Sequence, residues 1–469
     1  MRLSVIGCGH LGAVHAACMA DIGHDVLGVD LDEGKITLLK SGKAWFHEPG
    51  LDEMLSRNLA AGRLRFTTSL AEAAEFGRAH FLGVATPGLP DGTYDLSQVI
   101  SAVASLARQL SRPSLIVGKS TVPPGTAASL LAMAAKISPA SNVDIAWNPE
   151  FLREGSAVRD TLMPDRIVVG AVNDTAEMVV REIYRPLTDA GTPLVVTDLA
   201  TAELVKGAAN AFLASRISFI NAMADICTAV DGDVRALADA LGLDPRIGQS
   251  FLKAGIGYGG ACLPKDVRGL AAFADQAGEH SASELLMLVD SINTARRERV
   301  VRLVREAVAD RSVARESPDG SLTGKRITVL GAAFKPGTDD IRDSPSLDIA
   351  CRLHALGAQV TVYDPMATGN AFLAFPEFTY ADSAIDAANG ADVILVSTAW
   401  PEFAETDPVV AGAAVASMTV VDACQGIDVA AWQATGWEVL SLTGGNADPL
   451  MGRPGTFATF STAARESLG

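Results

Sequence analysis

The chain has 469 residues, of which 48% are hydrophobic and 20% are charged. This composition is typical of a folded globular protein and excludes a fibrous, collagenous or disordered chain. At roughly 150 residues per domain, the length predicts about three domains or two large ones with a connector. The formal net charge of −17 argues against a general nucleic-acid or anionic-membrane binder, so an anionic ligand needs a local basic pocket.

Targeting and metal-binding patterns are missing from the sequence. The six cysteines show no C-x-x-C spacing, which predicts neither a zinc ribbon nor a disulfide framework and favours a reducing cytoplasm. The seven histidines form no H-E-x-x-H pattern, so no metal site is expected. The N-terminus enters a strand-like run without a signal peptide, and no apolar stretch of about 18 residues predicts a membrane span.

The first 198 residues alternate between strand-like and helical patterns. Leu3–Ile6 is an apolar run that leads into the Gly-rich Gly7–Gly12, a helical stretch to about Asp21, and a second run at Asp25–Asp30. Further strand-like runs follow at His80–Ala85, Ser114–Lys119 and Arg166–Gly170. This alternation predicts a parallel, doubly wound α/β domain over residues 1–198.

The Gly-rich turn has the context of a dinucleotide site. Gly7, Gly9 and Gly12 follow a strand and open a helix, and Asp30 closes the next strand. The glycines permit the tight turn, the approach of a pyrophosphate and close helix packing. Asp30 would accept hydrogen bonds from the adenosine ribose and repel a 2′-phosphate, which selects NAD over NADP; a turn that binds nothing is the alternative. Lys35 either contacts the ribose or is a solvated surface lysine.

A long helical pattern covers residues 199–230 and is apolar on more than one stripe. Its apolar positions are Leu204, Val205, Ala208, Phe212, Leu213, Ile217, Ile220, Met223 and Ile226. Such a helix must be covered on several sides. It is either a core helix between two domains or a helix shared with a second subunit, and both can hold together.

The second half of the chain repeats the pattern of the first. After a Pro- and Gly-containing linker at 311–324, the runs Arg326–Gly331, Gln359–Asp364 and Ala391–Thr398 echo the three runs that begin the chain. This predicts a second nucleotide-binding α/β unit over residues 325–469. Because the loop after Gly331 lacks G-x-G-x-x-G, that unit should hold a different nucleotide group or hold it differently.

Cys262 is the best candidate for a nucleophile. It follows a glycine-dense loop and precedes Pro264, a residue suited to the first turn of a helix. A thiol at a helix N-terminus with Lys265 nearby is expected to have its thiolate favoured.

Two further groups of polar residues suggest chemistry. Lys206 and Asn210 are four residues apart on the long helix, so both can meet one reacting oxygen; the alternative is that Lys206 pairs with Glu203. Glu150 and Glu154 flank an arginine in a segment that also reads as an ordinary helix start.

The segment Lys119–Gly125 follows a strand at its carboxyl end, where open α/β sheets bind ligands. Thr121 would orient a water or a substrate hydroxyl there, or the segment is a plain turn.

Five motifs occur in the order of one known family: K-S-T-x-P-x-G, N-P-E-F-L-R-E-G, A-E-L-x-K-x-x-x-N, G-x-G-Y-G-G-x-C-x-P-K-D and K-P-G-T-D-D-x-R-D-S-P. Over almost its whole length the chain resembles the UDP-glucose/GDP-mannose dehydrogenase family, whose NAD-dependent enzymes oxidise the C6 alcohol of a nucleotide sugar to a carboxylate. The resemblance implies two Rossmann-like doubly wound domains joined by a long central helix, and a homodimer. It assigns residues 1–198 to NAD binding, 199–310 to dimerisation and the catalytic cysteine, and 325–469 to the nucleotide sugar.

The resemblance also implies roles for individual residues. Cys262 is the nucleophile that forms a thiohemiacetal and then a thioester. Lys206, Asn210 and Asp266 hold the reacting oxygen and the water, Glu150 is the acid/base of thioester hydrolysis, and Thr121 orients the water. The implied cofactor residues are Gly7, Gly9, His10, Leu11, Gly12, Asp30, Lys35, Thr86, Thr121, Glu154 and Arg342. The implied substrate residues are Glu150, Phe151, Leu152, Arg153, Lys206, Asn210, Arg246, Phe251, Lys253, Gly259, Phe334 and Lys335, with Arg246 expected to act across the dimer.

Four of these residues form the expected basic pocket for a diphosphate: Arg153, Arg246, Lys253 and Lys335. The sugar is open between UDP-glucose and GDP-mannose, because the cysteine lies in Ala261–Leu263 where UDP-glucose enzymes more often have Ser-Cys-Phe. The stretch 246–260 resembles the UDP-glucose subgroup more, and the cysteine lacks the V-G-G-H-C context of N-acetylamino-sugar dehydrogenases. A catalytically silent regulator on this fold is the alternative of another class, and the presence of a complete catalytic set disfavours it.

Overall fold

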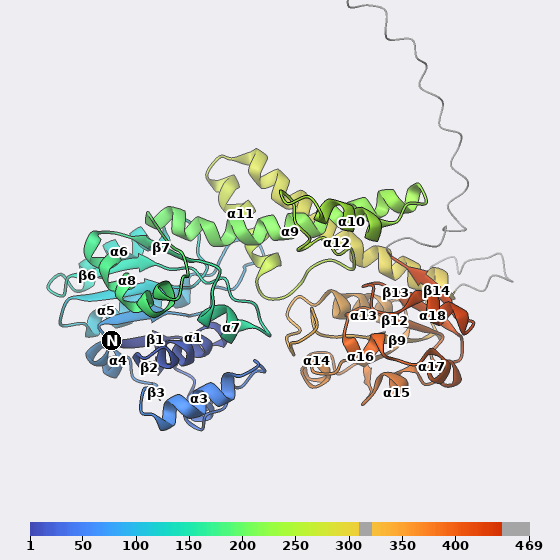
Figure 1. Cartoon of the computed structure of the whole chain (residues 1–469), viewed down its shortest axis with the longest axis horizontal. Helices are drawn as coiled ribbons and strands as arrows, with labels where there is room; N and C mark the ends of the chain where they lie inside the picture. Colours follow the sequence, from blue (N-terminus) through green and yellow to red (C-terminus); the bar gives the residue numbers. More distant parts are fainter. Residues whose placement is uncertain (309–320, 443–469) are drawn as a thin grey trace, which may run out of the picture.

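The computed structural model describes residues 1–308 and 321–442. Two α/β lobes lie side by side, and the long helix α9 (Leu199–Ala229) runs over the first toward the second (Figure 1). The predicted linker at 311–324 falls mostly outside the described residues, as does the end of the predicted second unit after residue 442.

The N-terminal lobe is built on an eight-stranded sheet in the order β3-β2-β1-β4-β5-β6-β7-β8. Its strands are β1 (Arg2–Ile6), β2 (Asp25–Val29), β3 (Leu64–Thr67), β4 (Ala79–Leu82), β5 (Ser114–Gly118), β6 (Val143–Trp147), β7 (Ile167–Ala171) and β8 (Leu194–Thr197). Its helices are α1 (His10–Asp21), α2 (Glu33–Lys40), α3 (Leu51–Ala60), α4 (Leu70–Phe76), α5 (Ser97–Gln109), α6 (Thr126–Ile137), α7 (Ala157–Leu162) and α8 (Asp174–Asp189). The central strands are buried on both faces, which explains why the sequence shows them as continuous apolar runs.

One strand pair departs from the predicted parallel arrangement. β7 runs antiparallel to β6, with Ala146 opposite Ala171, whereas the other neighbouring strands of this sheet are parallel. A parallel neighbour needs a crossover that packs back on the sheet. The segment between β6 and β7 instead carries only the short α7, which packs against α1, so the chain re-enters the sheet in the opposite direction.

The C-terminal lobe has a six-stranded parallel sheet in the order β11-β10-β9-β12-β13-β14. Its strands are β9 (Arg326–Leu330), β10 (Gln359–Tyr363), β11 (Thr379–Tyr380), β12 (Val393–Val396), β13 (Thr419–Asp422) and β14 (Glu438–Ser441). Its helices are α13 (Pro345–Ala355), α14 (Thr368–Ala374), α15 (Ala384–Ala388), α16 (Pro401–Ala404), α17 (Pro408–Ala414) and α18 (Val429–Ala434). The order repeats that of the first six strands of the N-terminal sheet, which confirms the predicted fold class of two doubly wound units.

Four helices connect the lobes: α9, α10 (Val234–Gly242), α11 (Leu263–Gln276) and α12 (His280–Val308). α9 begins at Asp198, whose carboxylate accepts the Thr201 amide at 2.8 Å and so caps the helix. Small residues of α9 pack against α11 and α12, while Phe212, Phe219 and Ile226 remain 65%, 50% and 55% exposed. Within the described residues, no helix has the length and apolar character that crossing a membrane requires.

Candidate active site

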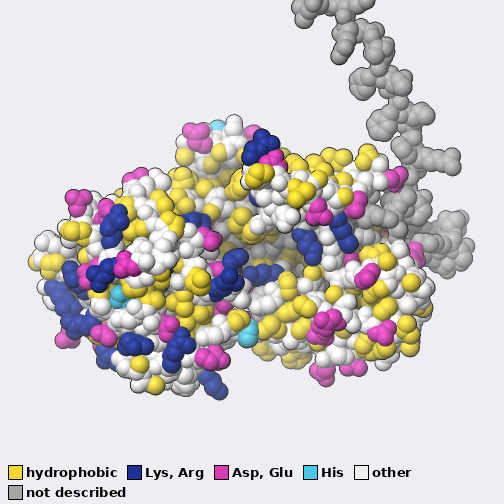
Figure 2. All heavy atoms as spheres, in the orientation of Figure 1, with side chains coloured by type: hydrophobic (Ala, Val, Ile, Leu, Met, Phe, Trp, Pro, Cys, Tyr) yellow, Lys and Arg dark blue, Asp and Glu magenta, His cyan; other side chains and the backbone are white. Residues whose placement is uncertain are grey.

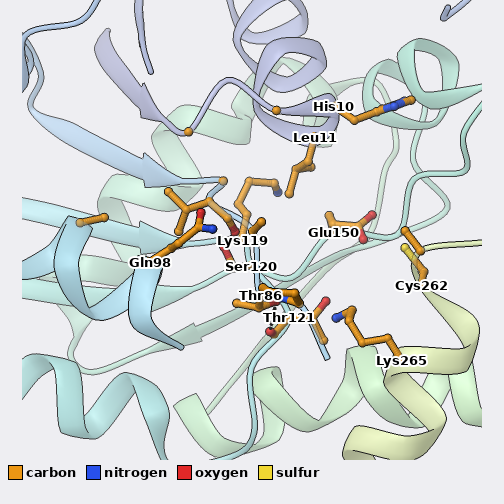
Figure 3. Close-up of a pocket in the computed structure, with 18 of the residues that line it drawn as sticks. His10, Leu11, Thr86, Gln98, Lys119, Ser120, Thr121, Glu150, Cys262 and Lys265 are labelled. Carbon is orange, nitrogen blue, oxygen red and sulfur yellow. Dashed lines mark hydrogen bonds between the residues drawn. The ribbon is translucent and has the colours of Figure 1, made fainter. Parts of the chain in front are cut away.

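A pocket of about 1050 Å³ lies at the carboxyl ends of β1, β4 and β5 (Figure 3). Ten of the predicted cofactor residues line it: Gly7, Gly9, His10, Leu11, Asp30, Lys35, Thr86, Thr121, Glu154 and Arg342. Cys262 and Glu150 line the same pocket. The structure therefore brings the predicted cofactor residues and the predicted nucleophile to one cavity.

The three glycines of the turn differ in what they allow. Gly7 has a φ of +88°, and a Cβ there would lie 2.8 Å from the Val84 amide nitrogen. At Gly12 a Cβ would collide with the Gly7 carbonyl, so this glycine permits close packing and does not line the pocket. Gly9 has open space where a side chain would be. The turn thus exposes backbone to a pyrophosphate as a dinucleotide requires.

Asp30 is held at the pocket by the backbone. Its Oδ2 accepts the Cys8 amide at 2.8 Å and its Oδ1 accepts the Asp32 amide at 3.0 Å. Lys35 also lines the pocket, and its Nζ lies 5.2 Å from the centre of the Trp45 ring. The Asp30 carboxylate, which accepts one backbone amide on each oxygen and lines the pocket, and the open backbone at Gly9 fit NAD.

In the C-terminal lobe, the acid at the corresponding position accepts a different set of hydrogen bonds. Asp364 follows β10 as Asp30 follows β2, but its Oδ2 accepts the amides of Ala332 and Ala333 and the indole N–H of Trp400. Its Oδ1 accepts two more amides from the turn after it. Five internal donors thus saturate the two oxygens of this buried carboxylate, whereas Asp30 accepts from only two, so Asp364 has no acceptor left for a ribose, which agrees with the predicted difference between the units.

Two pairs of polar side chains lie beside the pocket, and one member of each pair is on α9. The Lys206 Nζ lies 2.9 Å from the Glu150 Oε1, and the Asn210 Nδ2 donates to the Asp266 Oδ2 at 2.6 Å. Lys206, Asn210 and Asp266 are buried. The alternative pairing of Lys206 with Glu203 is wrong, because Glu203 accepts the amides at the start of α6.

The charge of Lys206 follows from these partners. Burial opposes the ammonium form, but Glu150, Cys262 and Asp266 outweigh it and raise the pKa of Lys206. Lys206 is therefore a buried ammonium that can donate to a developing oxyanion.

Cys262 caps the N-terminus of α11, with Pro264 in its first turn as predicted. The residue is exposed to the pocket, whereas Cys8, Cys18 and Cys227 are buried. The expectation of a favoured thiolate is wrong for this structure: the surrounding protein and the carboxylates of Glu150 and Asp266 raise the pKa of Cys262 to about 12, against the influence of Lys206. Lys265 offers no compensation because its Nζ pairs with Asp266 at 2.9 Å.

Thr121 follows β5 and lines the pocket, and its carbonyl accepts the Thr86 hydroxyl at 2.8 Å. Lys119, two residues earlier, also lines the pocket; the sequence predicted a ligand-binding segment from this residue onward but no role for Lys119 itself. It is buried, and its Nζ donates to the Asn148 Oδ1 at 3.0 Å. Burial lowers the pKa of Lys119 to about 8, with Lys206 adding to the effect and Glu150 opposing it. A lysine that ends an apolar strand was the signal available in the sequence.

The predicted substrate residues fall into two groups. In the first, around Glu150 and the loop before Cys262, the centre of the Phe151 ring lies 3.8 Å from the Arg166 guanidinium and 5.8 Å from the Lys206 Nζ, and the Leu152 amide donates to Glu150 at 2.7 Å. This group also holds Gly259, Phe334 and Lys335: a Cβ at Gly259 would collide with the Asp343 carbonyl, the Phe334 ring lies against Gly260, and the Lys335 Nζ donates to the Glu154 carbonyl at 2.7 Å.

The second group is dispersed. Arg153 pairs with Asp160 at 2.7 Å, and Arg246 pairs with Asp244 at 2.6 Å with its side chain 87% exposed. The Lys253 Nζ lies 3.4 Å from the Gln425 carbonyl, and Phe251 is partly exposed with a φ of +63°. None of these residues lines the main pocket, and of the first group Phe151, Gly259, Phe334 and Lys335 do not line it either. Figure 2 shows Lys and Arg side chains along the middle of the molecule between the lobes. The basic pocket for a diphosphate stays a prediction.

No group of three or more His, Cys, Asp or Glu within residues 1–308 and 321–442 is placed to hold a metal ion.

Comparison with known proteins assigns the chain as a whole. Residues 1–188 match the NAD binding domain of the UDP-glucose/GDP-mannose dehydrogenase family, residues 200–295 its central domain and residues 328–429 its UDP binding domain. The chain belongs to this family. It is an NAD-dependent dehydrogenase, and the predicted resemblance is confirmed.

Individual relatives agree with this assignment. The chain is 44% identical over 418 residues to the UDP-glucose 6-dehydrogenase of Haloferax volcanii, with 87% of this chain and 93% of the relative covered. It is 42% identical to the UDP-glucose 6-dehydrogenase of Rhizobium meliloti, with 87% and 91% covered. Among solved structures, a UDP-glucose dehydrogenase from Pyrobaculum islandicum superposes with a TM-score of 0.85 at 35% identity, with 95% of this chain and 98% of that one covered.

Proposed function

We propose that the chain catalyses the four-electron oxidation of UDP-glucose to UDP-glucuronate with NAD. The observation that carries this proposal is the exposed thiol of Cys262 in the cofactor pocket, in a neighbourhood that also holds the Lys206–Glu150 ion pair. An alcohol oxidised twice without release of the aldehyde needs a covalent tether, and a thiol supplies one. The names of the relatives support UDP-glucose over GDP-mannose as the substrate.

The residues that line the pocket would hold NAD, which would supply the hydride acceptor for the two oxidations at C6, with the hydroxyl proton of each oxidation released to solvent. Lys206 and Asn210 would hold the C6 oxygen, since an ammonium and an amide N–H both stabilise a developing oxyanion. Cys262 adds to the aldehyde carbon and forms a thiohemiacetal, whose oxidation gives a thioester. As the C–S bond forms, the thiol proton passes to the aldehyde oxygen, so the addition does not need a free thiolate, which the raised pKa of Cys262 disfavours.

Hydrolysis ends the cycle. A water adds to the thioester carbon, Glu150 takes its proton, and the C–S bond breaks to return Cys262 and release the carboxylate. Thr121 would orient this water from the end of β5. Glu150 suits the role because it lines the pocket together with Cys262 and its Oε1 lies 2.9 Å from the Lys206 Nζ.

The nucleotide would bind between the lobes, with Phe334 and Lys335 from the C-terminal lobe and the UDP binding domain providing the contacts. The exposed apolar residues of α9 and α12 support a homodimer formed through these helices; they are Phe212, Phe219, Ile226, Leu285 and Leu288. Arg246, exposed and outside the pocket of its own chain, would act across this interface. A reducing cytoplasm would keep Cys262 as a thiol.

The test is a turnover screen in which the purified protein and NAD are incubated with UDP-glucose, GDP-mannose or UDP-N-acetylglucosamine while NADH absorbance is followed. We expect turnover with UDP-glucose at least about tenfold faster than with either other sugar, equivalent to about 1.4 kcal/mol of discrimination. Preference for GDP-mannose would replace the proposed substrate. No NADH with any sugar would favour a catalytically silent regulator.

A further inference from the structure

Glu48 is a buried carboxylate outside every residue set described above. It lies in the loop between α2 and α3, and its side chain is 0% exposed. One oxygen accepts the Ala157 amide at 2.7 Å, and the other accepts the Gly155 amide at 2.8 Å and lies 3.4 Å from the His10 Nε2. A buried carboxylate is therefore satisfied by two distant parts of the chain.

The first of these parts is the dinucleotide turn. His10 begins α1 and lines the cofactor pocket (Figure 3). Phe46, two residues before Glu48, stacks on the His10 ring with centroids 4.1 Å apart. The loop that carries Glu48 is thus fixed against the turn by a stacked ring as well as by the Glu48 contact.

The second part is the segment that places Glu154 at the pocket. Residues 151–156 contain no helix or strand, so their position depends on contacts such as the two amide bonds to Glu48. The Glu154 carbonyl accepts the Lys335 Nζ at 2.7 Å, and its carboxylate pairs with Arg342 at 2.9 Å. A Cβ at Gly155 would lie 2.6 Å from the Gly337 carbonyl, so the segment touches the C-terminal lobe directly.

We infer that Glu48 is a positioning residue that holds Glu154 in the cofactor pocket. Glu48 fixes the 153–157 segment to the dinucleotide turn on one side, while the C-terminal lobe holds the segment on the other side. Hydrogen bonds to a buried carboxylate are charge-assisted, and loss of the charge leaves amides without a full acceptor. The inference rests on the proposed assignment of Glu154 to the cofactor site. The competing explanation is that Glu48 only caps the short α7, in which case it would stabilise the fold without acting through Glu154.

The experiment measures NAD binding by isothermal titration calorimetry in the full chain. The variants are Glu48→Gln, Glu154→Ala, the double variant, and Glu53→Gln as a matched control on the exposed face of α3. We expect Glu48→Gln to raise the Kd for NAD about tenfold, as the loss of charge-assisted hydrogen bonds predicts. In the Glu154→Ala background the same change should add less than about twofold, because coupled residues are not additive. Glu53→Gln should leave the Kd unchanged.

An unchanged Kd in Glu48→Gln, or an equal loss in both backgrounds, would overturn the inference, since the residue would then act on folding alone or through another group. If Glu154→Ala binds NAD as tightly as the parent, the assignment of Glu154 to the cofactor fails and the inference fails with it. If Glu48→Gln does not fold, Glu48→Asp replaces it. Its shorter carboxylate should weaken NAD binding in the parent background and have little effect in Glu154→Ala.

Discussion

The Lys206 ammonium and the Glu150 carboxylate lie 2.9 Å apart, although 56 residues separate them in the chain. Burial opposes the ammonium form of Lys206, and the Glu150 carboxylate is the strongest of the influences that raise its pKa nevertheless. One pair thus places an ammonium and a carboxylate beside the pocket that Cys262 lines, as the proposed oxyanion donor and general base.

If Glu150 serves only the hydrolysis step, Glu150→Gln should keep the shape of the site and remove the base. Both oxidations should then proceed while the thioester persists, because the amide cannot take the proton of the attacking water. We expect a burst of NADH followed by a steady rate lower by at least about a hundredfold. Intact-protein mass spectrometry should find a sugar adduct that maps to Cys262.

Cys262→Ala is the control for that experiment and should show neither burst nor adduct. A Glu150→Gln enzyme that turns over at the parent rate, or one that stalls before any NADH forms, would mean that Glu150 has another role.

Asp30 should set the choice of dinucleotide. Asp30→Ala removes both the acceptor for the ribose and the charge that repels a 2′-phosphate, so kcat/KM with NAD should fall about tenfold or more while the preference against NADP narrows. Asp32→Ala is the matched control, since Asp32 accepts the Lys35 amide and caps α2. Asp32→Ala should lower the thermal midpoint and leave the ratio of kcat/KM with NAD to kcat/KM with NADP unchanged. The same ratio in both variants would show that Asp30 does not face the ribose.

Lys119 should make stability rise at alkaline pH. Burial lowers its pKa to about 8 from 10.5. Below about pH 8 both the folded and the unfolded state carry the proton, so the full cost of burying the charge is present. Between about pH 8 and 10.5 the unfolded state binds more protons than the folded state. The free energy of unfolding therefore rises with pH in this range, by roughly 3 kcal/mol at most. Lys119→Met should remove this rise.

Thermal midpoints at pH 7, 8.5 and 10 in the parent, Lys119→Met and the exposed Lys136→Met measure the effect. The difference between the parent and Lys119→Met should change with pH, while Lys136→Met should follow the parent. Parallel curves for all three proteins would show that Lys119 keeps its ordinary pKa.

The exposed aromatic residues of α9 should hold the dimer together. Phe212 and Phe219 are seven residues apart, two turns along one helix face, and replacing both with Ser removes apolar area without disturbing a packed core. Light scattering should find a monomer, with a raised KM for the sugar because the proposed action of Arg246 across the interface would be lost. Leu373→Ser on α14, 79% exposed, is the control and should stay dimeric. A dimeric double variant would place the interface elsewhere.

The sequence predicted what depends on local pattern. Gly7, Gly9, Gly12 and Asp30 lie within one strand–turn–helix–strand unit, so their spacing was enough to place the cofactor pocket. The repeat of that unit in the C-terminal half was visible for the same reason, because buried parallel strands appear as apolar runs.

The errors arose where partners come from distant elements. Local spacing suggested Glu203 for Lys206, whereas the true partner follows β6. The thiolate of Cys262 was inferred from its own helix, but burial by the surrounding protein and the Glu150 carboxylate from another element raise its pKa. Glu48 carried no signal in the sequence, since only the fold brings it to Gly155.

The central claim is that Cys262 tethers the substrate through two oxidations, and the ratio of NADH formed to sugar acid formed tests it most directly. Complete conversion of a known amount of UDP-glucose, with NADH measured by absorbance and the sugar acid by chromatography, should give about two NADH per UDP-glucuronate and no free aldehyde in a carbonyl-trapping assay. A ratio near one, with a trapped aldehyde as the product, would contradict the account.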